Sequence, residues 1–255
     1  MLFDFSGIHD IIENGRAYMH ARFIRREIMD LYLDCRSGIS GDMILGALVG
    51  LGADQRYVEQ QKALLGICGE NDAAVKKEHG HSHRGFKDIT DMISGSGLDE
   101  DVAGMVKAIY SVIAAAEARV HKASPETVHF HEVGRDGAIL NMTGTAAALK
   151  SLDIKNIYCS EIHDGQGRIR CSHGVIPVPV PAVAAMMEEC SYRFASEEIQ
   201  TEMVTPTGLA VLIGTGAEYT ETVPEERSII RKAVCRGTRQ TGKKGLEAFL
   251  FDSGR

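Results

Sequence analysis

The chain has 255 residues, of which 28 are Lys or Arg and 35 are Asp or Glu, and its formal net charge is −7. Hydrophobic residues make up 44% of the sequence and charged residues 25%, a balance typical of a folded domain that excludes wholesale disorder. No apolar run approaches the roughly 20 residues of a membrane-spanning helix, no secretory signal is recognisable, and the six cysteines form no Cys-x-x-Cys pair. These features exclude a zinc ribbon and a disulfide scaffold, and they predict a cytoplasmic protein with no membrane partner.

Charge is unevenly distributed along the chain. Residues 225–255 carry eight basic and four acidic side chains, residues 1–29 carry four of each sign, and the middle is acidic. An acidic surface repels phosphate groups, so no nucleic-acid partner is expected. Two interpretations of the basic C-terminal segment stay open: it binds one small anionic molecule, or it is a solvated edge.

The predicted elements alternate between strands and helices. A predicted helical extension over 1–29 precedes a strand at 31–33, which ends at Asp34. Apolar spacing then predicts helices at 43–52, 54–66, 99–121 and 138–149, a strand at 156–162, and helices at 182–189 and from Pro206 onward. Three prolines at 177, 179 and 181 exclude a central strand there. Residues 228–235 and 246–252 alternate as the strands of a hairpin around Gly242.

Strands and helices that alternate in this way predict an α/β fold, with a mixed sheet and surrounding helices. We expect three segments: the extension at 1–29, an α/β domain at 30–217, and a basic C-terminal hairpin segment at 218–255.

The first candidate site is the glycine-rich loop that joins the first strand to the first helix. Backbone N–H groups and the positive end of a helix suit a phosphate group. Two carboxylates flank the loop and can hold a cation beside that phosphate. The predicted phosphate-binding residues are Ser37, Gly38, Ser40 and Gly41, and the flanking carboxylates are Asp34 and Asp42. The alternative is a tight turn in which Asp42 interacts with the helix dipole.

The second candidate is the segment from His129 to Glu132. Residues two apart on an extended chain point the same way, so His129 and His131 can reach one metal ion. Neutral imidazoles suit nickel, zinc or copper, and Glu132 can orient a ligand or move a proton. The alternative is a pair of loop histidines with ordinary hydrogen bonds.

A short polar stretch contains the third candidate, His79, His81 and His83. His-rich tracts of this kind bind divalent metals loosely, which fits metal collection better than chemistry.

Three further patterns have less weight. Residues 237–244 spell a phosphate-loop pattern except at Lys244, where Ser or Thr is needed to bind magnesium, so an ATPase is excluded. Cys171 has no visible activating group, which leaves His173 as a second-tier site residue. Thr205 and Thr207 begin the helix after Pro206 and are second-tier residues as well.

These blocks together resemble the LarC-type nickel-insertion family. The resemblance rests on residues 31–43, 128–134, 172–179 and 204–208, which occur in the family's order, and it covers roughly residues 30–240. It implies a nickel chelatase that inserts nickel into pyridinium-3,5-bisthiocarboxylic acid mononucleotide. The product would be the nickel-pincer nucleotide, with two Ni–S bonds and one Ni–C bond, which is the cofactor of lactate racemase and related enzymes. The resemblance also implies CTP hydrolysis with manganese or magnesium.

On this resemblance, the 37–41 loop takes the substrate phosphate, and the histidines at 79–83 pass nickel to His129 and His131. Glu132, with His131, is the expected catalytic residue and accepts the proton released when the ring carbon is metallated. Alanine at His129 or His131 should then abolish insertion. An alternative function is a nickel carrier, or a subunit that supports a full-length relative, without turnover.

Two departures from the family pattern stand out. Gly137 and Asn141 occupy positions where the family usually carries carboxylates. The sequence also stops before the CTP-binding C-terminal domain of the full-length family, so 218–255 would be the remnant of a junction. Either a separate CTP-binding chain supplies that domain, or the chain is a short paralogue with altered chemistry. The apo-enzyme that receives the cofactor is another expected partner.

Overall fold

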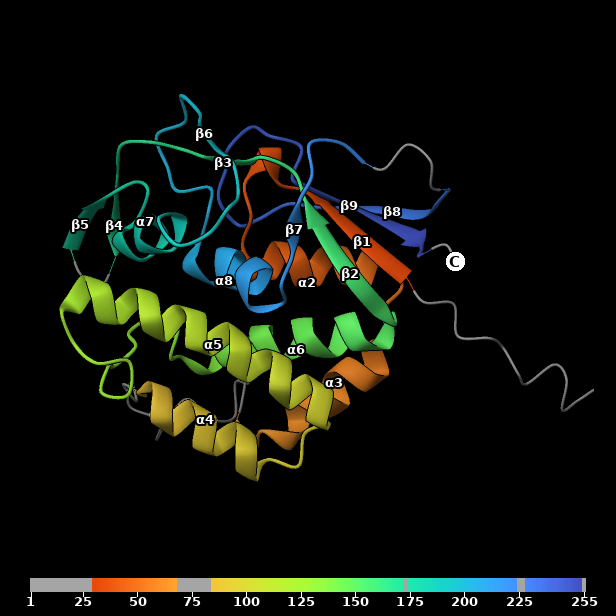
Figure 1. Ribbon diagram of the computed structural model, residues 1–255, viewed down its shortest axis with the longest axis horizontal. Helices are drawn as coiled ribbons and strands as arrows, with labels where there is room; N and C mark the ends of the chain where they lie inside the picture. Colours follow the sequence, from red (N-terminus) through yellow and green to blue (C-terminus); the bar gives the residue numbers. More distant parts are fainter. Residues whose placement is uncertain (1–28, 68–83, 172–173, 224–227, 254–255) are drawn as a thin grey trace, which may run out of the picture.

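The computed structural model describes residues 29–67, 84–171, 174–223 and 228–253 (Figure 1). The predicted extension lies outside the described residues except for Met29, which begins the first strand. In chain order the elements are β1 (Met29–Asp34), the 3-10 turn η1 (Cys35–Ser37), α2 (Gly41–Gly50), α3 (Gln55–Leu64), α4 (Phe86–Gly95), α5 (Glu100–His121), α6 (Asp136–Ser151), β2 (Ile154–Cys159), β3 (Ile162–Asp164), β4 (Arg168–Cys171), β5 (Gly174–Pro177), α7 (Pro181–Met187), β6 (Phe194–Ser196), α8 (Pro206–Gly214), β7 (Glu218–Tyr219), β8 (Ile229–Cys235) and β9 (Leu246–Asp252).

The main sheet has the strand order β7-β2-β1-β9-β8. Strand β1 pairs parallel with β2 and antiparallel with β9, so the sheet is mixed, as predicted. Alternation along β1 explains its central place: Leu31 and Leu33 enter the main core, while Tyr32 packs with Phe249 and Phe251 on the opposite face. The predicted hairpin forms as β8 and β9, and β9 lies between β8 and β1. The 218–255 segment therefore contributes to the same sheet as the 30–217 segment.

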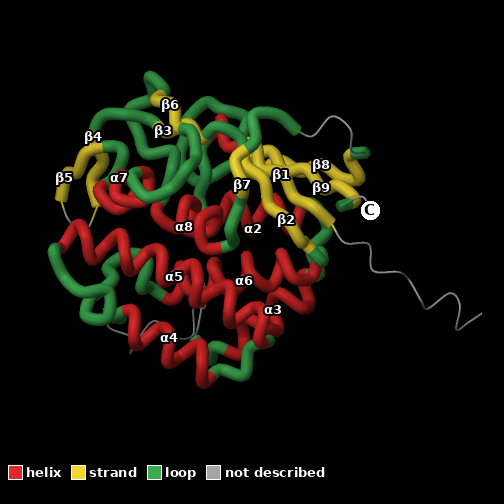
Figure 2. The backbone as a smooth tube through the Cα atoms, viewed as in Figure 1, coloured by secondary structure: helices red, strands yellow, loops and turns green. Residues whose placement is uncertain are grey.

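Helices cover one face of this sheet (Figures 1 and 2). Helix α2 packs on β8 and β9, α6 packs behind α2 and against α3 and α5, and α5 contacts α4, α7 and α8. The sequence of α6 explains its inner position, because small and apolar residues from Met142 to Leu149 are buried all round the helix. Among the described residues, no helix is long and apolar enough to cross a bilayer.

The structure corrects several predicted bounds. The strand predicted at 156–162 is divided into β2 and β3 at residues 160–161, where the Oγ of Ser160 accepts the N–H of Cys35 at 2.8 Å. Helix α4 and the β4–β5 hairpin were not predicted; both are short, and in β4 half-buried and exposed residues alternate at an edge. The predicted exclusion of a central strand at Pro177 is confirmed, since β5 belongs to a two-stranded edge hairpin.

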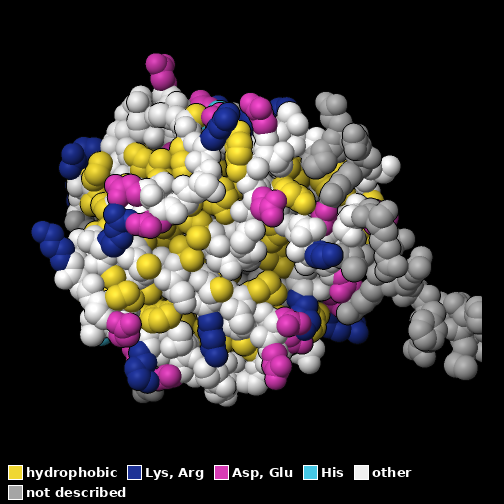
Figure 3. Space-filling model, viewed as in Figure 1, with side chains coloured by type: hydrophobic (Ala, Val, Ile, Leu, Met, Phe, Trp, Pro, Cys, Tyr) yellow, Lys and Arg dark blue, Asp and Glu magenta, His cyan; other side chains and the backbone are white. Residues whose placement is uncertain are grey.

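A separate apolar surface lies away from the strands' carboxyl ends. Figure 3 shows apolar side chains gathered over α7 and α8, with charged side chains scattered around them. A cavity of about 690 Å³ opens between α5, α7 and α8 and is lined largely by alanines with Val112, Met186 and Ile213. The lining also includes Arg119, Lys122 and Glu189, and Arg119 pairs with Glu189 at 2.5 Å, but none of the predicted site residues is part of the described lining.

Candidate functional site

The loop after β1 lies against the segment that precedes α8. Ile39 donates to the carbonyl of Met203 at 2.9 Å, and Thr205 donates to the carbonyl of Ile39 at 3.0 Å. Gly38 has φ +85°, and a Cβ there would lie 2.4 Å from the Met203 carbonyl oxygen, so glycine is required. Two blocks distant in sequence are thus joined at the carboxyl end of β1.

A cavity of about 680 Å³, here called the hairpin cavity, opens beside this junction. One wall is the start of α2, with Ser37, Ser40 and Asp42, and the other is the loop between β8 and β9. That loop contributes three basic side chains, Arg236, Arg239 and Lys243. Two of the predicted phosphate-binding residues, Ser37 and Ser40, line the cavity, and Gly38 and Gly41 belong to the same loop. The basic segment and the predicted phosphate loop therefore face each other.

The two predicted carboxylates are placed differently. Asp42 lines the hairpin cavity and accepts a 2.6 Å hydrogen bond from Ser40. Asp34 pairs with Arg36 at 2.9 Å, and the residues described around this cavity do not include it. The structure therefore does not bring the two carboxylates together at this cavity, because Asp34 turns towards Arg36 directly after β1.

A second cavity of about 380 Å³, here called the histidine cavity, adjoins the first. Its polar lining includes Glu117 and His121 of α5, His131 and Glu132 of the following loop, and Cys171 at the end of β4. Thr205 and Thr207, the second-tier residues, also line it. Thr205 caps α8 by accepting the N–H of Gly208 at 3.1 Å, so its side chain has a structural role as well.

The imidazole beside His131 comes from α5. The ring centroids of His121 and His131 lie 6.3 Å apart, and Nε2 of His121 lies 3.4 Å from Oε2 of Glu117. His129 is exposed, bridges to Gly85, and is missing from the described lining of both cavities. The chain bends at 131–132, so the extended geometry that would point His129 and His131 the same way ends too early. The structure thus brings His131 beside His121, and His129 lies outside the described linings of both cavities.

The remaining predicted residues either lie outside the two cavities or belong to segments that the structure does not describe. His79, His81, His83 and His173 fall in the segments that the structure does not describe. The first residues after the 68–83 segment are tied to the histidine segment, because Phe130 donates to the carbonyl of Arg84 at 3.0 Å. Gly137 and Asn141 lie in α6 and are not part of the described cavity linings.

Glu202, Thr205 and Arg239 line both cavities and therefore mark their junction. Glu202 is only 4% exposed and accepts a charge-assisted hydrogen bond from Arg239. The pKa of Glu202 is raised to about 7: burial is the largest cause, Arg239 opposes it, and the nearby carboxylates of Asp164 and Glu132 add to the rise. A buried carboxyl group that titrates near neutral pH thus lies between a basic cavity and an imidazole-bearing cavity.

Asp164 holds the segment that carries Glu202. Its Oδ1 accepts the N–H groups of Met203 at 2.8 Å and Val204 at 3.0 Å. Its Oδ2 is buried with no hydrogen-bond partner among the described residues, and burial raises the pKa of this carboxyl. Asp164 therefore positions Glu202 from the end of β3.

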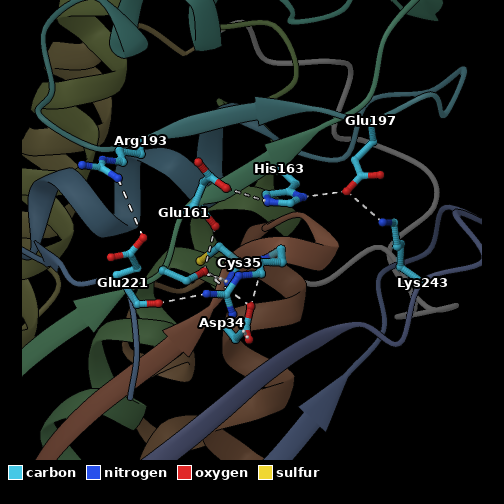
Figure 4. A network of polar contacts seen from close by, with 10 residues as sticks. Asp34, Cys35, Glu161, His163, Arg193, Glu197, Glu221 and Lys243 are labelled. Atoms are coloured by element: carbon cyan, nitrogen blue, oxygen red, sulfur yellow. Dashed lines mark hydrogen bonds and ion pairs between the residues drawn. The ribbon is translucent and has the colours of Figure 1, made fainter. Parts of the chain in front are cut away.

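A polar network fixes the hairpin loop from the other side (Figure 4). His163 lies between Glu161 and Glu197, with ring nitrogens 3.2 and 2.6 Å from their carboxylate oxygens. Lys243 reaches Glu197 at 2.8 Å, and together with His163 it lowers the pKa of that carboxyl. Lys243 is thereby held at the wall of the hairpin cavity.

No group of three His, Cys, Asp or Glu side chains among the described residues is arranged to hold a metal ion. Sequence reasoning missed Glu117, His121, Glu202 and Arg239 as site residues. The four-residue spacing of Glu117 and His121 on a predicted helix was an available signal. No local sequence signal pointed to Glu202, because its burial arises only when β3, α8 and the hairpin loop meet.

The fold and the site define an α/β protein with two adjoining cavities, one basic and one bearing imidazoles. The chain belongs to the nickel insertion protein family, whose model matches residues 31–249, and the family predicted from the motifs is thereby confirmed.

Several relatives carry the name pyridinium-3,5-bisthiocarboxylic acid mononucleotide nickel insertion protein, and three of them illustrate the similarity. The one from Acetivibrio thermocellus is 39% identical over 84% of this chain and 58% of its own length. The Alkaliphilus metalliredigens protein is 33% identical over 88% of this chain and 61% of its own length. A Staphylococcus epidermidis protein is 40% identical over 72% of this chain and 50% of its own length. The chain thus spans half to about three fifths of the length of these relatives. No solved structure matches it.

Proposed function

We propose that this chain inserts nickel into pyridinium-3,5-bisthiocarboxylic acid mononucleotide, acting as a nickel chelatase in the cytoplasm. The names of its relatives support this substrate. The structural observation that carries the proposal is the junction of the two cavities at Glu202, Thr205 and Arg239. A ligand with a phosphate at one end and two thiocarboxylates at the other matches a basic cavity that opens into an imidazole-bearing one.

The hairpin cavity would hold the phosphate end. Ser40 caps α2, so the N-terminus of a ten-residue helix faces the cavity together with Ser37. Arg236 and Lys243 supply positive charge from the opposite wall, and their hydrogen bonds to a phosphate would be charge-assisted. Of the two interpretations of the basic C-terminal segment, this proposal favours binding of a small anion over a solvated edge.

Nickel, as a substrate, would be held by His131 and His121 in the histidine cavity. The carboxylate of Glu117 would orient the His121 ring, the usual arrangement around a metal-bound imidazole. His79, His81 and His83 would collect nickel and pass it through His129, since Gly85, two residues after His83 in the sequence, bridges to His129. Asp42, at the wall of the other cavity, would bind a cation beside the phosphate. Asp34 would support the loop through Arg36.

The family resemblance adds CTP and a manganese or magnesium ion. The described residues contain no three-carboxylate or histidine cluster suited to such an ion. We therefore assign no residue of this chain to CTP. The test below compares reactions with and without CTP, and a separate chain that binds CTP is a proposed partner. The apo-enzyme that receives the finished cofactor is a further proposed partner.

The test is mass spectrometry of the mononucleotide after incubation with the purified chain and Ni²⁺, with and without CTP. A gain of one nickel by the mononucleotide supports the chelatase, and a CTP requirement points to a second nucleotide-binding chain. Nickel retained by the protein without any change in the mononucleotide would instead support the alternative, a carrier or a subunit of a full-length relative. The exposed His129 and the imidazole pair, His121 and His131, are the observations that favour a carrier.

A further inference from the structure

We propose that Glu202 accepts the proton that leaves the pyridinium ring when the Ni–C bond forms, a role that rests on the nickel-insertion function proposed above. Glu202 lines both cavities and is 4% exposed. A mononucleotide with its phosphate in the hairpin cavity and its thiocarboxylates in the histidine cavity has its ring at their junction. The junction is where the Glu202 carboxyl lies, on the segment that Asp164 clamps through Met203 and Val204.

The other carboxylates near the cavities are less suited to this proton. Asp42 lines the hairpin cavity but accepts a hydrogen bond from Ser40, away from the imidazoles. Glu132 lines the histidine cavity but is exposed, so its carboxylate is more hydrated than the buried carboxyl of Glu202. Glu117 is 3.4 Å from His121, which it orients.

The electrostatics of the junction suit a base. Arg239 pairs with Glu202, and the carboxylates of Asp164 and Glu132 lie close enough to act on it. The outcome is a pKa of about 7, so the carboxyl is ready to gain or lose a proton at neutral pH. Arg239 keeps the carboxylate oriented, and its own side chain reaches both cavities.

The step balances without an oxidant or a reductant. The substituents at ring positions 3 and 5 flank carbon 4, and two anionic thiocarboxylate sulfurs bind Ni²⁺. The C–H bond at carbon 4 breaks, its electron pair forms the Ni–C bond, and the proton moves to the Glu202 carboxylate. Nickel stays divalent throughout. Glu202 then loses the proton to water.

The experiment uses the full chain and a mononucleotide carrying deuterium at ring carbon 4, with Ni²⁺ and, where the wild type requires it, CTP. Loss of deuterium reports C–H cleavage, and gain of nickel reports binding through sulfur, so the two events are measured separately by mass spectrometry. The wild type should yield a nickel adduct without deuterium, at a rate that rises with pH towards a plateau above about pH 7. Glu202→Gln should retain deuterium in its nickel adduct, with label loss slowed at least about 100-fold. Glu202→Asp should restore part of the rate and the rising limb of the pH profile.

The matched control is Glu247→Gln, which removes a carboxylate of the same hairpin that pairs with Lys232 at 2.6 Å and lies outside the described lining of both cavities. It should leave the pH profile of label loss unchanged. Normal label loss by Glu202→Gln overturns the proposal while the nickel-insertion function stands. A flat wild-type profile between pH 5 and 8 also overturns it, even if the Gln variant fails to fold. A wild type that never adds nickel to the mononucleotide overturns the proposed function itself.

Discussion

The hydroxyl of Tyr110, on α5, donates a 2.9 Å hydrogen bond to the backbone carbonyl of Val133, and both residues are buried. This bond ties the loop that carries His131 and Glu132 to the helix that carries His121. Burial raises the pKa of the Tyr110 hydroxyl, so the hydroxyl keeps its proton and remains a donor at neutral pH. The relative position of the two imidazoles thus depends on a contact made by neither of them.

Tyr110→Phe should lower the free energy of unfolding by about 1–2 kcal/mol, because the Val133 carbonyl stays buried without its donor. It should also weaken nickel binding, measured by competition with a coloured chelator. Tyr192→Phe is the matched control, since Tyr192 donates to the Ala217 carbonyl at 2.9 Å away from the cavities. The control should lose similar stability in urea titrations and bind nickel normally. Equal nickel affinity in both variants would contradict the positioning role.

Gly38→Ala should destabilise the protein by roughly 2 kcal/mol or more, since alanine is strained at φ +85° and its Cβ meets the Met203 carbonyl. Gly97→Ala separates the two effects, because Gly97 has φ +73° but nothing within 4 Å of a Cβ. Denaturant titrations should show a clearly smaller loss, about 1 kcal/mol, for the Gly97 variant. Similar losses would mean that the contact with Met203 is unimportant.

Lys243→Gln should raise the KM for the mononucleotide about tenfold, because one charge-assisted contact to its phosphate is removed. The neighbouring Lys244→Gln is the control, since Lys244 is exposed and lies outside the described lining of the hairpin cavity. The difference should shrink at high ionic strength, where charge interactions are screened. Identical KM values for the two variants would place the phosphate elsewhere.

His131→Ala and His121→Ala should each lower the affinity for nickel by about tenfold or more, because one imidazole ligand is lost. His131→Ala should also abolish insertion. For His129→Ala the expected effect differs from the loss of insertion predicted from the sequence. Because His129 lies away from the described cavity linings, its loss should slow nickel delivery more than it weakens nickel binding in the histidine cavity. Stopped-flow uptake and equilibrium binding distinguish the two effects. Unchanged insertion by His131→Ala would remove the histidine cavity from the mechanism.

The stability of the protein should depend on pH through Glu202. Its pKa is about 7 in the folded protein and 4.5 ordinarily, so the folded state binds the extra proton between these values. The contribution of Glu202 to stability is therefore greatest below pH 4.5 and is lost as the pH rises to about 7, by up to roughly 3 kcal/mol. Urea titrations of wild type and Glu202→Gln should show a difference that changes across this window and is constant above it. Parallel curves would show that the Glu202 carboxyl is not perturbed.

Much of the fold could be read from local patterns. Helices α2, α3, α5 and α6 follow apolar spacing and lie within a few residues of their predicted bounds, and Thr205 caps α8 with Pro206 behind it, as predicted. The β4–β5 hairpin could not be found this way, because half-buried and exposed residues alternate over only four residues in β4. The 156–162 strand likewise divides where Ser160 makes a long-range bond to Cys35, a contact that no local pattern encodes.

The sequence by itself determined the local features: a glycine-rich loop that begins a helix, a histidine segment, a basic hairpin and the alternation of strands and helices. Their grouping into two joined cavities was decided by tertiary structure. Strand β9 inserts beside β1 and carries the hairpin loop to the start of α2, and the bend after Phe130 turns His131 towards His121. Glu202 shows the physical reason most clearly: its pKa of about 7 comes from burial by segments far apart in the chain, and no local pattern encodes that burial.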